Sequence, residues 1–377
     1  MPPAIHRFRL EPHYASIAAG IAVLILYGSF YPFAFYLHYD PRGPVGALIE
    51  SGSRPFSQDD VVANIFLYLP FGFFVFYALE RRTLPAIAAA TAAGFALSLA
   101  VELVQFYDIG RFQELTDIYS NTLGSLLGAA AAAAVRRWVS PPYLFLILAC
   151  WMGYRWYPAS PPAPLASLWI LSIPLLDLFR FFAAWLAVGL MIESLFGESR
   201  SRMALPVFLA VSLLVQALTA EVEPAEIAGG AAAAMVWSGT LWRLPARARI
   251  VAALFVVLIA LLALEPFHFS TPARAFGWVP FRSFLEAESG GAIRSFFEKA
   301  FLYGGMMWLL VRAGSSVGAA AAFAATLVFA LRLIQVYLPG RSAEITDTIL
   351  VLIFAAMLKL GSLIPRPNSP RADILEV

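Results

Sequence analysis

The sequence has little charge, a single cysteine and few histidines. Of its 377 residues only 13% are Asp, Glu, Lys or Arg, whereas an ordinary soluble domain has about 25%. The 26 basic residues almost balance the 24 acidic ones, which excludes a strongly basic nucleic-acid-binding protein. Cys150 alone can form neither an intramolecular disulfide nor a cysteine metal cluster, and the four histidines lack metal-ligand spacing. We therefore expect no nucleic-acid partner, no bound metal and no cofactor.

Apolar residues, by contrast, make up 60% of the chain, and the mean hydropathy is +0.76. A helix needs about 20 apolar residues to cross a bilayer, and continuous apolar runs are unlike the alternating strands of a membrane β-barrel. The sequence predicts an all-α polytopic membrane protein with about twelve transmembrane helices. They fall near residues 14–36, 60–79, 84–107, 116–135, 142–157, 175–196, 203–220, 225–242, 249–266, 293–311, 316–338 and 344–362.

The distribution of Lys and Arg predicts the orientation of these spans. If the spans alternate, 15 Lys and Arg residues lie in loops on one side and 8 on the other. Cytoplasmic loops are enriched in Lys and Arg, so we expect a multi-pass protein of the bacterial inner (plasma) membrane with both termini in the cytoplasm. On this topology Arg155 lies in an outer loop. Inside one span Asp177 and Arg180 lie three residues apart, where a local ion pair is expected.

A polar segment recurs in the second half of the chain. Residues 102–117, ELVQFYDIGRFQELTD, and residues 332–347, RLIQVYLPGRSAEITD, are identical at eight of sixteen positions. The distance between them leaves room for a further copy, which is only weakly visible around Gln216. We predict three tandem four-helix units with parallel orientation at 14–137, 142–245 and 249–362. The alternative for the central unit is four unrelated helices.

Polar residues gather at the predicted outer ends of the first unit's helices. They occur at spacings of three and four, which place them on common helix faces. Arg111, in the loop between the third and fourth spans, is close enough in sequence to pair with Glu102 or Asp117. Ionisable residues in membrane helices are costly and often functional, so the alternatives are a latch between helix ends, a ligand site or catalysis. The candidate ligand-binding residues are Asp60, Asn64, Glu102, Gln105, Arg111, Asp117 and Asn121.

The C-terminal unit has the same residues at some of these positions and different residues at the others. Arg332 stands where the first unit has Glu102, Lys299 stands near the place of Asn64, and Val351 replaces Asn121. The added cations make this unit a candidate partner for phosphate or carboxylate. The secondary candidate residues are Lys299, Arg332, Gln335, Arg341 and Asp347.

The ordered polar motifs of the first unit resemble the VanZ-like family of bacterial membrane proteins over about residues 26–135. The matching residues are Asp60, Asn64, Pro70 and Gly72, then Glu102, Gln105 and Arg111, then Asp117, Asn121, Gly124 and Gly128. Gly124 and Gly128 have the small-xxx-small spacing that allows close helix packing. Residues 260–362 resemble a degenerate second copy. The founding member of the family is associated with teicoplanin resistance, so the resemblance implies a bacterial-envelope context and no defined reaction.

Three functions are compatible with these observations. The first is binding of an amphipathic envelope molecule, either a lipid-linked precursor or a lipoglycopeptide, at a polar site near the outer leaflet, linked through the family to glycopeptide resistance. The second is a transporter or flippase of a lipid-linked substrate. The third is an intramembrane enzyme that uses Glu102 and Asp117 as an acid/base pair. Binding is favoured over catalysis because the sequence shows no nucleophile, metal set or cofactor loop. The expected partners are membrane lipids and a lipid-linked glycan or glycopeptide.

Overall fold

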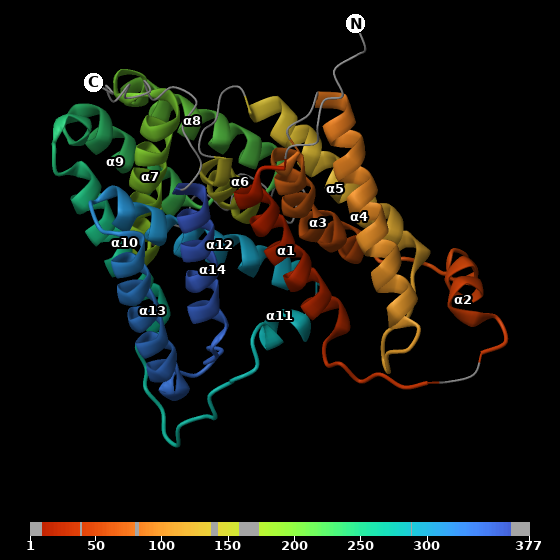
Figure 1. The fold of residues 1–377 in the computed structure, drawn as a ribbon. Helices are drawn as coiled ribbons and strands as arrows, with labels where there is room; N and C mark the ends of the chain where they lie inside the picture. Colours follow the sequence, from red (N-terminus) through yellow and green to blue (C-terminus); the bar gives the residue numbers. More distant parts are fainter. Residues whose placement is uncertain are drawn as a thin grey trace, which may run out of the picture.

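A computed structural model describes residues 10–37, 40–79, 83–136, 142–157, 173–287 and 289–362. These residues form fourteen α-helices (Figure 1), and the only β-type pairings among them are isolated bridges. The predicted domain limit at residue 137 lies outside the described residues. So do several of the arginines that underlie the predicted orientation, namely Arg7, Arg9, Arg81, Arg82, Arg137, Arg366 and Arg371.

The N-terminal unit consists of four long helices and one short one. They are α1 (Pro12–Phe30), α2 (Gly43–Ser51), α3 (Gln58–Ala78), α4 (Thr83–Gln105) and α5 (Leu115–Val135). The short helix α2 lies to one side of the long helices, near one end of the bundle (Figure 1). Helix α3 begins with a side-chain cap, because Ser57 Oγ accepts a hydrogen bond from the Asp60 N–H.

Glycines bring α3 and α5 into close backbone contact. A Cβ atom on Gly128 would lie 2.0 Å from the Leu69 carbonyl oxygen, and one on Gly72 would lie 2.0 Å from the Ser125 carbonyl oxygen. A Cβ on Gly124 would likewise meet the Ile65 carbonyl oxygen at 2.4 Å. The glycine spacing on α5 therefore serves close helix packing, as the sequence predicts.

Nine further α-helices follow. They are α6 (Pro142–Trp156), α7 (Leu175–Phe196), α8 (Glu198–Thr219), α9 (Pro224–Gly239), α10 (Arg247–Leu264), α11 (Arg282–Leu285), α12 (Ser289–Arg312), α13 (Val317–Ile334) and α14 (Thr346–Ser362). Their buried apolar side chains form one continuous core, with Trp185, Phe255 and Phe301 among its members, whereas the N-terminal unit has two smaller cores of its own. The central and C-terminal helices are thus packed around shared side chains.

Each of the twelve predicted spans coincides with a helix, but only eight stretches of the described residues are long and apolar enough to cross a membrane. These are Pro12–Phe30, Gln58–Ala78, Thr83–Gln105, Leu115–Val135, Leu175–Phe196, Arg200–Thr219, Arg247–Leu264 and Val317–Tyr337. Helices α6, α9 and α14 have only 15, 16 and 17 residues, and α12 carries several charges. The predicted number of twelve transmembrane helices is therefore larger than the length and composition of the helices support.

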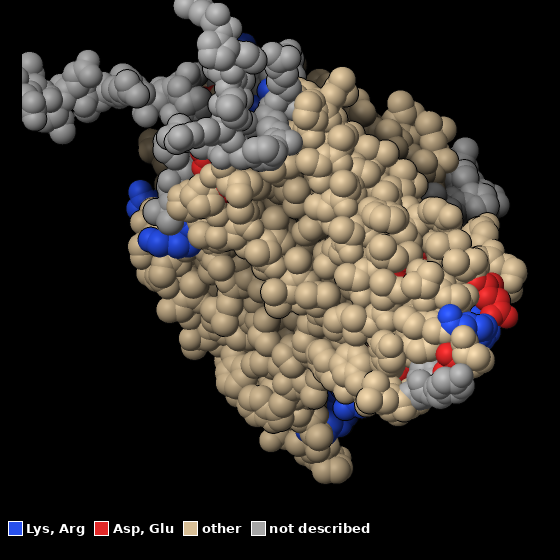
Figure 2. Space-filling model, turned by 45° about the vertical axis from the view of Figure 1, so that its right-hand side comes forward, with Lys and Arg blue, Asp and Glu red and all other residues tan. Residues whose placement is uncertain are grey.

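Helices α1, α4, α13 and α14 run lengthwise through the molecule, whereas α12 lies across this direction (Figure 1). Helix α1 begins, and α14 ends, at the same end of the bundle (Figure 1). Seen from one side, the surface between the ends is almost free of Lys, Arg, Asp and Glu, which gather at its margins (Figure 2). An apolar belt bounded by charged ends is the surface expected of a protein that spans a bilayer.

Candidate functional site

Glu102, predicted as a ligand-binding or catalytic carboxylate, joins the end of α4 to the beginning of α5. It is buried, and its Oε2 atom accepts a hydrogen bond of 2.8 Å from the N–H of Glu114, the residue that precedes α5. Gln113 Nε2 donates to the Glu102 main-chain carbonyl at 2.7 Å. The first N–H groups of a helix have no partner within the helix, so Glu102 supplies one from a neighbouring helix. In this arrangement one oxygen of the carboxylate is engaged as a cap.

Gln105 and Arg111 bind the C-terminal end of α1. Gln105 Nε2 donates to the Ser29 carbonyl at 3.0 Å, and the Arg111 guanidinium donates to the carbonyls of Tyr31 at 3.1 Å and Gly28 at 3.4 Å. Arg111 is close in sequence to Glu102 and Asp117, but among the described residues it forms an ion pair with neither. The last carbonyls of a helix lack intrahelical partners and carry partial negative charge, so a cation is favoured beside them.

The other candidate residues of the first unit differ in how far their side chains are buried. Asn121 is buried and donates from Nδ2 to Ser98 Oγ at 2.9 Å, which joins α5 to α4. Asp117 is half-buried beside Asn64, and no described Lys or Arg lies within ion-pair distance of it. Asp60 is exposed at the start of α3. The structure thus brings most of this set to one end of the unit, where several members hold helix ends together.

The C-terminal unit makes the same helix-end contacts with its own residues. Gln335 Nε2 donates to the Ala263 carbonyl at 2.6 Å, and Arg341 Nε donates to the Glu265 carbonyl at 2.8 Å, both near the end of α10. Arg341 also forms an ion pair of 2.9 Å with the Glu265 side chain. These two secondary candidates therefore fasten α10 as Gln105 and Arg111 fasten α1.

The remaining secondary candidates form a buried ionic cluster. Asp347 is fully buried at the beginning of α14, 2.9 Å from Lys299 Nζ and in an ion pair with Arg332. The Tyr303 hydroxyl donates to Asp347 Oδ2 at 2.6 Å and accepts from Arg332 at 2.8 Å. One carboxylate is therefore shared by two cations.

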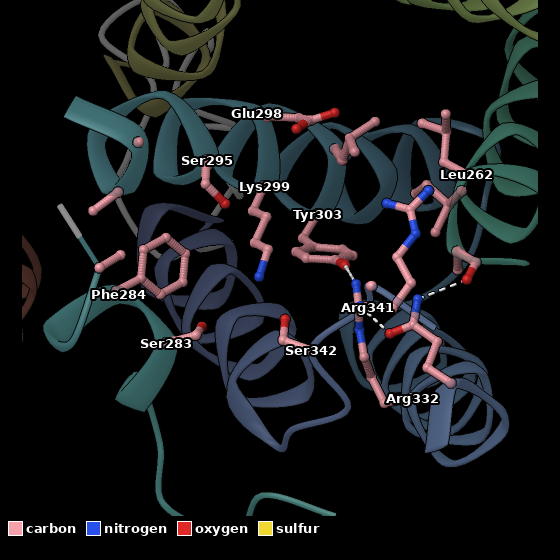
Figure 3. A pocket seen from close by; sticks show the side chains of 18 residues that line it. Leu262, Ser283, Phe284, Ser295, Glu298, Lys299, Tyr303, Arg332, Arg341 and Ser342 are labelled. Atoms are coloured by element: carbon pink, nitrogen blue, oxygen red, sulfur yellow. Dashed lines mark hydrogen bonds between the residues drawn. The ribbon is translucent and has the colours of Figure 1, made fainter. Parts of the chain in front are cut away.

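A cavity of about 310 Å³ opens beside this cluster, between α10, α11, α12 and the end of α13 (Figure 3). Lys299 and Ser295 extend from α12 into this cavity, opposite Phe284 of α11 (Figure 3), whose ring centre lies 4.8 Å from Lys299 Nζ. Of the secondary candidates, four line it directly: Lys299, Arg332, Gln335 and Arg341. We call it the α12 cavity.

A second hollow of about 400 Å³ adjoins the α12 cavity and shares Ser295, Glu298 and Arg341 with it. Its wall adds Arg180 and Arg294. Arg180 forms an ion pair with Glu298 at 2.5 Å, so the predicted local pair with Asp177 is wrong, because α12 packs alongside and offers a carboxylate. Arg294 has no carboxylate within ion-pair distance among the described residues.

The sequence did not predict four side chains of the second hollow as site residues, namely Tyr154, Arg180, Arg294 and Glu298. Arg180 lies on α7 and Tyr154 on α6, both outside the repeated segment, while Glu298 and Arg294 lie on α12. A signal was present, because Arg180 stands inside an apolar run and Glu298 directly precedes Lys299. Neither position indicates its partner, since the contact joins helices more than 100 residues apart in sequence.

The central helices contain a separate polar cluster around one buried arginine. Arg155, predicted in an outer loop, is buried in the last turn of α6. It forms an ion pair with Glu226 and donates to Ser212 Oγ at 3.0 Å and Gln216 Oε1 at 2.5 Å. Its guanidinium also lies 4.9 Å from the ring centre of Trp185. A buried charge with this many partners serves packing of α6, α8 and α9 rather than ligand binding.

Long apolar helices, a face almost free of charge and polar clusters at the helix ends define a multi-pass membrane protein. Residues 14–136, about a third of the chain, match the family model described as VanZ/LLP1, so the N-terminal unit is similar to that family. The match covers α1 as well as the three helices with the polar motifs. No curated protein and no solved structure matches the chain.

Proposed function

We propose that this protein is a VanZ-like integral protein of the bacterial plasma membrane that binds an amphipathic envelope molecule by its polar head. The observation that carries this proposal is the α12 cavity, a hollow at the end of apolar helices that is lined by Lys299, Arg332 and Arg341. Cations grouped at one end of a membrane bundle suit an anionic head group at the bilayer surface, while the apolar helix surfaces suit a lipid tail. The ligand classes that fit are a lipid-linked precursor and a lipoglycopeptide.

The proposed location is the outer leaflet. The α12 cavity lies at the ends of α10 and α13, opposite the end at which α1 begins (Figure 1). The excess of loop Lys and Arg is on the side of the predicted cytoplasmic termini. On that topology the cavity faces outward.

We further propose that residues 249–362 are a degenerate second VanZ-like copy. Equivalent hydrogen bonds support this: Gln105 to Ser29 corresponds to Gln335 to Ala263, and Arg111 to Tyr31 corresponds to Arg341 to Glu265. The loop pairings agree as well, since the Tyr36 N–H donates to the Tyr107 carbonyl at 2.8 Å and the Ser270 N–H donates to the Tyr337 carbonyl at 2.8 Å. Phe33 and Phe267, at matching positions, both have left-handed backbone, with φ of 64° and 61°. That the central unit is a third copy stays a prediction.

A binding measurement in lipid nanodiscs tests the proposed function. The ligands are a polyprenyl-diphosphate-linked sugar and teicoplanin, and the readout is ligand retained by the protein in native mass spectrometry. We expect at least one of them to bind, and Lys299→Met to weaken that binding about tenfold through loss of a charge-assisted contact. Arg42→Ala, which changes an exposed arginine next to α2, is the matched control.

The proposal fails if neither amphipathic ligand binds, or if Lys299→Met binds as tightly as Arg42→Ala. If teicoplanin is the ligand, expression of the protein in a susceptible host should also raise the teicoplanin concentration needed to stop growth, and Lys299→Met should abolish that increase.

A further inference from the structure

The α12 cavity and the hollow that adjoins it have several cationic side chains in their walls. Five cationic side chains lie in the two walls: Arg180, Arg294, Lys299, Arg332 and Arg341. The carboxylates that face them are Glu265 and Glu298 in the walls, Asp347 behind Lys299 and Glu344 behind Ser283, and the charges of Glu223 and Asp177 also act on Arg180. We propose that this site binds a phosphate-type dianion, in particular a diphosphate. The inference rests on the proposed function for its location and goes further in naming the chemistry of the head group.

The inner part of the site is fixed. Asp347 has a side chain that is 1% exposed, and it is held by Lys299, Arg332 and Tyr303 together. Breaking a buried pair is costly because the remaining charge stays unpaired. Asp347 therefore stays in place and holds the two cations at the cavity wall, and its single charge cannot neutralise both.

The outer part of the site is exchangeable. The side chains of Glu298 and Glu265 are 32% and 47% exposed, and they pair with Arg180 and Arg341. Exposed ion pairs contribute little to stability, so an incoming anion can displace these carboxylates into water. Their departure frees two guanidinium groups in addition to Arg294, which already lacks a carboxylate partner among the described residues.

The kinds of donor favour phosphate over carboxylate. Guanidinium groups bind phosphate oxygens in a two-pronged geometry, and a lysine ammonium adds a point charge. Here the donors come from α7, α12, α13 and the loop that follows it, so they surround a ligand from several directions. A tetrahedral phosphate presents oxygens in several directions, whereas a carboxylate presents two in one plane. Two adjoining hollows that share Ser295, Glu298 and Arg341 suit two linked phosphates.

Glu298 gives the proposal a sharp test, because it competes with the proposed ligand for Arg180. Removing its charge with Glu298→Gln should tighten binding of inorganic pyrophosphate several-fold, while Lys299→Met should weaken it about tenfold. Arg42→Ala should leave it unchanged. The measurement is isothermal titration calorimetry on the detergent-purified full chain, with citrate as a carboxylate probe of comparable charge and a melting temperature for every variant. If Lys299→Met does not fold, Glu298→Gln alone decides the outcome, since Glu298 is partly exposed.

The proposal is overturned if pyrophosphate does not bind the folded protein, if citrate binds as tightly, or if Glu298→Gln weakens binding. Geranyl diphosphate and geraniol then separate a lipid head group from a free anion. Tighter binding of geranyl diphosphate than of pyrophosphate indicates a lipid-borne phosphate, whereas equal binding indicates a free one. Pyrophosphate binding without any amphipathic ligand overturns the proposed function alone. Binding of an amphipathic ligand that pyrophosphate does not displace overturns this inference alone.

Discussion

The N-terminal and C-terminal units fasten their helices with matching hydrogen bonds, yet they carry opposite charge at the same end of the molecule. In the first unit Glu102 and Asp117 stand at the helix ends, and Asp117 has no cation within ion-pair distance among the described residues. In the second, Arg332 and Lys299 surround Asp347. The shared contacts are those that satisfy helix termini, so they are constrained by the fold. The residues that differ are not constrained by the fold in this way.

The difference in charge also changes what each carboxylate does. Glu102 Oε2 accepts a main-chain N–H and so contributes to the start of α5. Asp347, at the start of α14, is held by side chains from α12 and α13. One unit uses a carboxylate to join helix ends, and the other uses it to position cations beside a cavity.

The largest effect is expected from Asp347→Asn. It leaves Lys299 and Arg332 largely buried without their shared carboxylate, so the free energy of unfolding should fall by about 3–5 kcal/mol. The matched change in the first unit, Asp117→Asn, should cost less than about 1 kcal/mol because no ion pair is lost. Denaturant unfolding in detergent micelles measures both. Equal effects would mean that the two units do not differ in this way.

Gly128→Ala tests the close crossing of α3 and α5 in the VanZ-like unit. A Cβ atom there lies 2.0 Å from the Leu69 carbonyl oxygen, so the helices must move apart, at a cost of about 1–3 kcal/mol. The C-terminal unit has no such crossing to lose, because the corresponding position on α14 is Leu358. Gly20→Ala, where nothing lies within 4 Å, is the control and should be neutral or stabilise by about 0.5–1 kcal/mol. A neutral Gly128→Ala by thermal unfolding would contradict the described packing.

Gln105→Leu and Gln335→Leu compare the two units at their shared contact. Each removes one hydrogen bond to a carbonyl near a helix end, which should lower the free energy of unfolding by about 1 kcal/mol. Gln335→Leu should cost about 1 kcal/mol more, because Gln335 Oε1 also accepts a hydrogen bond from Arg332. The informative quantity is the difference between the two variants in the loss of unfolding free energy, measured in the same assay. A difference well above 1 kcal/mol would argue against equivalent roles.

The smallest effect is expected from Arg42→Ala. Arg42 pairs with Asp40 and Glu50 at the surface, where its own side chain is 50% exposed. Such pairs are screened by water and salt, so the melting temperature should not change measurably. A clear drop would show that the segment around α2 is tied to the bundle more tightly than its exposed position indicates.

Much of the helical architecture was predictable, whereas the site was predictable only in part. Apolar runs located a helix at each predicted span because local hydropathy decides which segments enter a bilayer. The recurrence of Gln105 and Arg111 as Gln335 and Arg341 indicated equivalent local roles. The sequence favoured the first unit as the ligand site, whereas the α12 cavity lies among the C-terminal helices. Sequence spacing does not show where space remains between packed helices, so the cavity was not predictable.

The sequence by itself determined the apolar helices, the close packing of Gly128 on α5 and the polar segment that recurs near the C-terminus. These are short-range properties, set by composition and by neighbours one or two turns apart. Only the tertiary structure decided that Arg111 binds the end of α1, that Arg180 pairs with Glu298, and that Lys299 and Arg332 share Asp347 beside a cavity. Those partners come from helices distant in sequence, and packing alone brings their charges within reach.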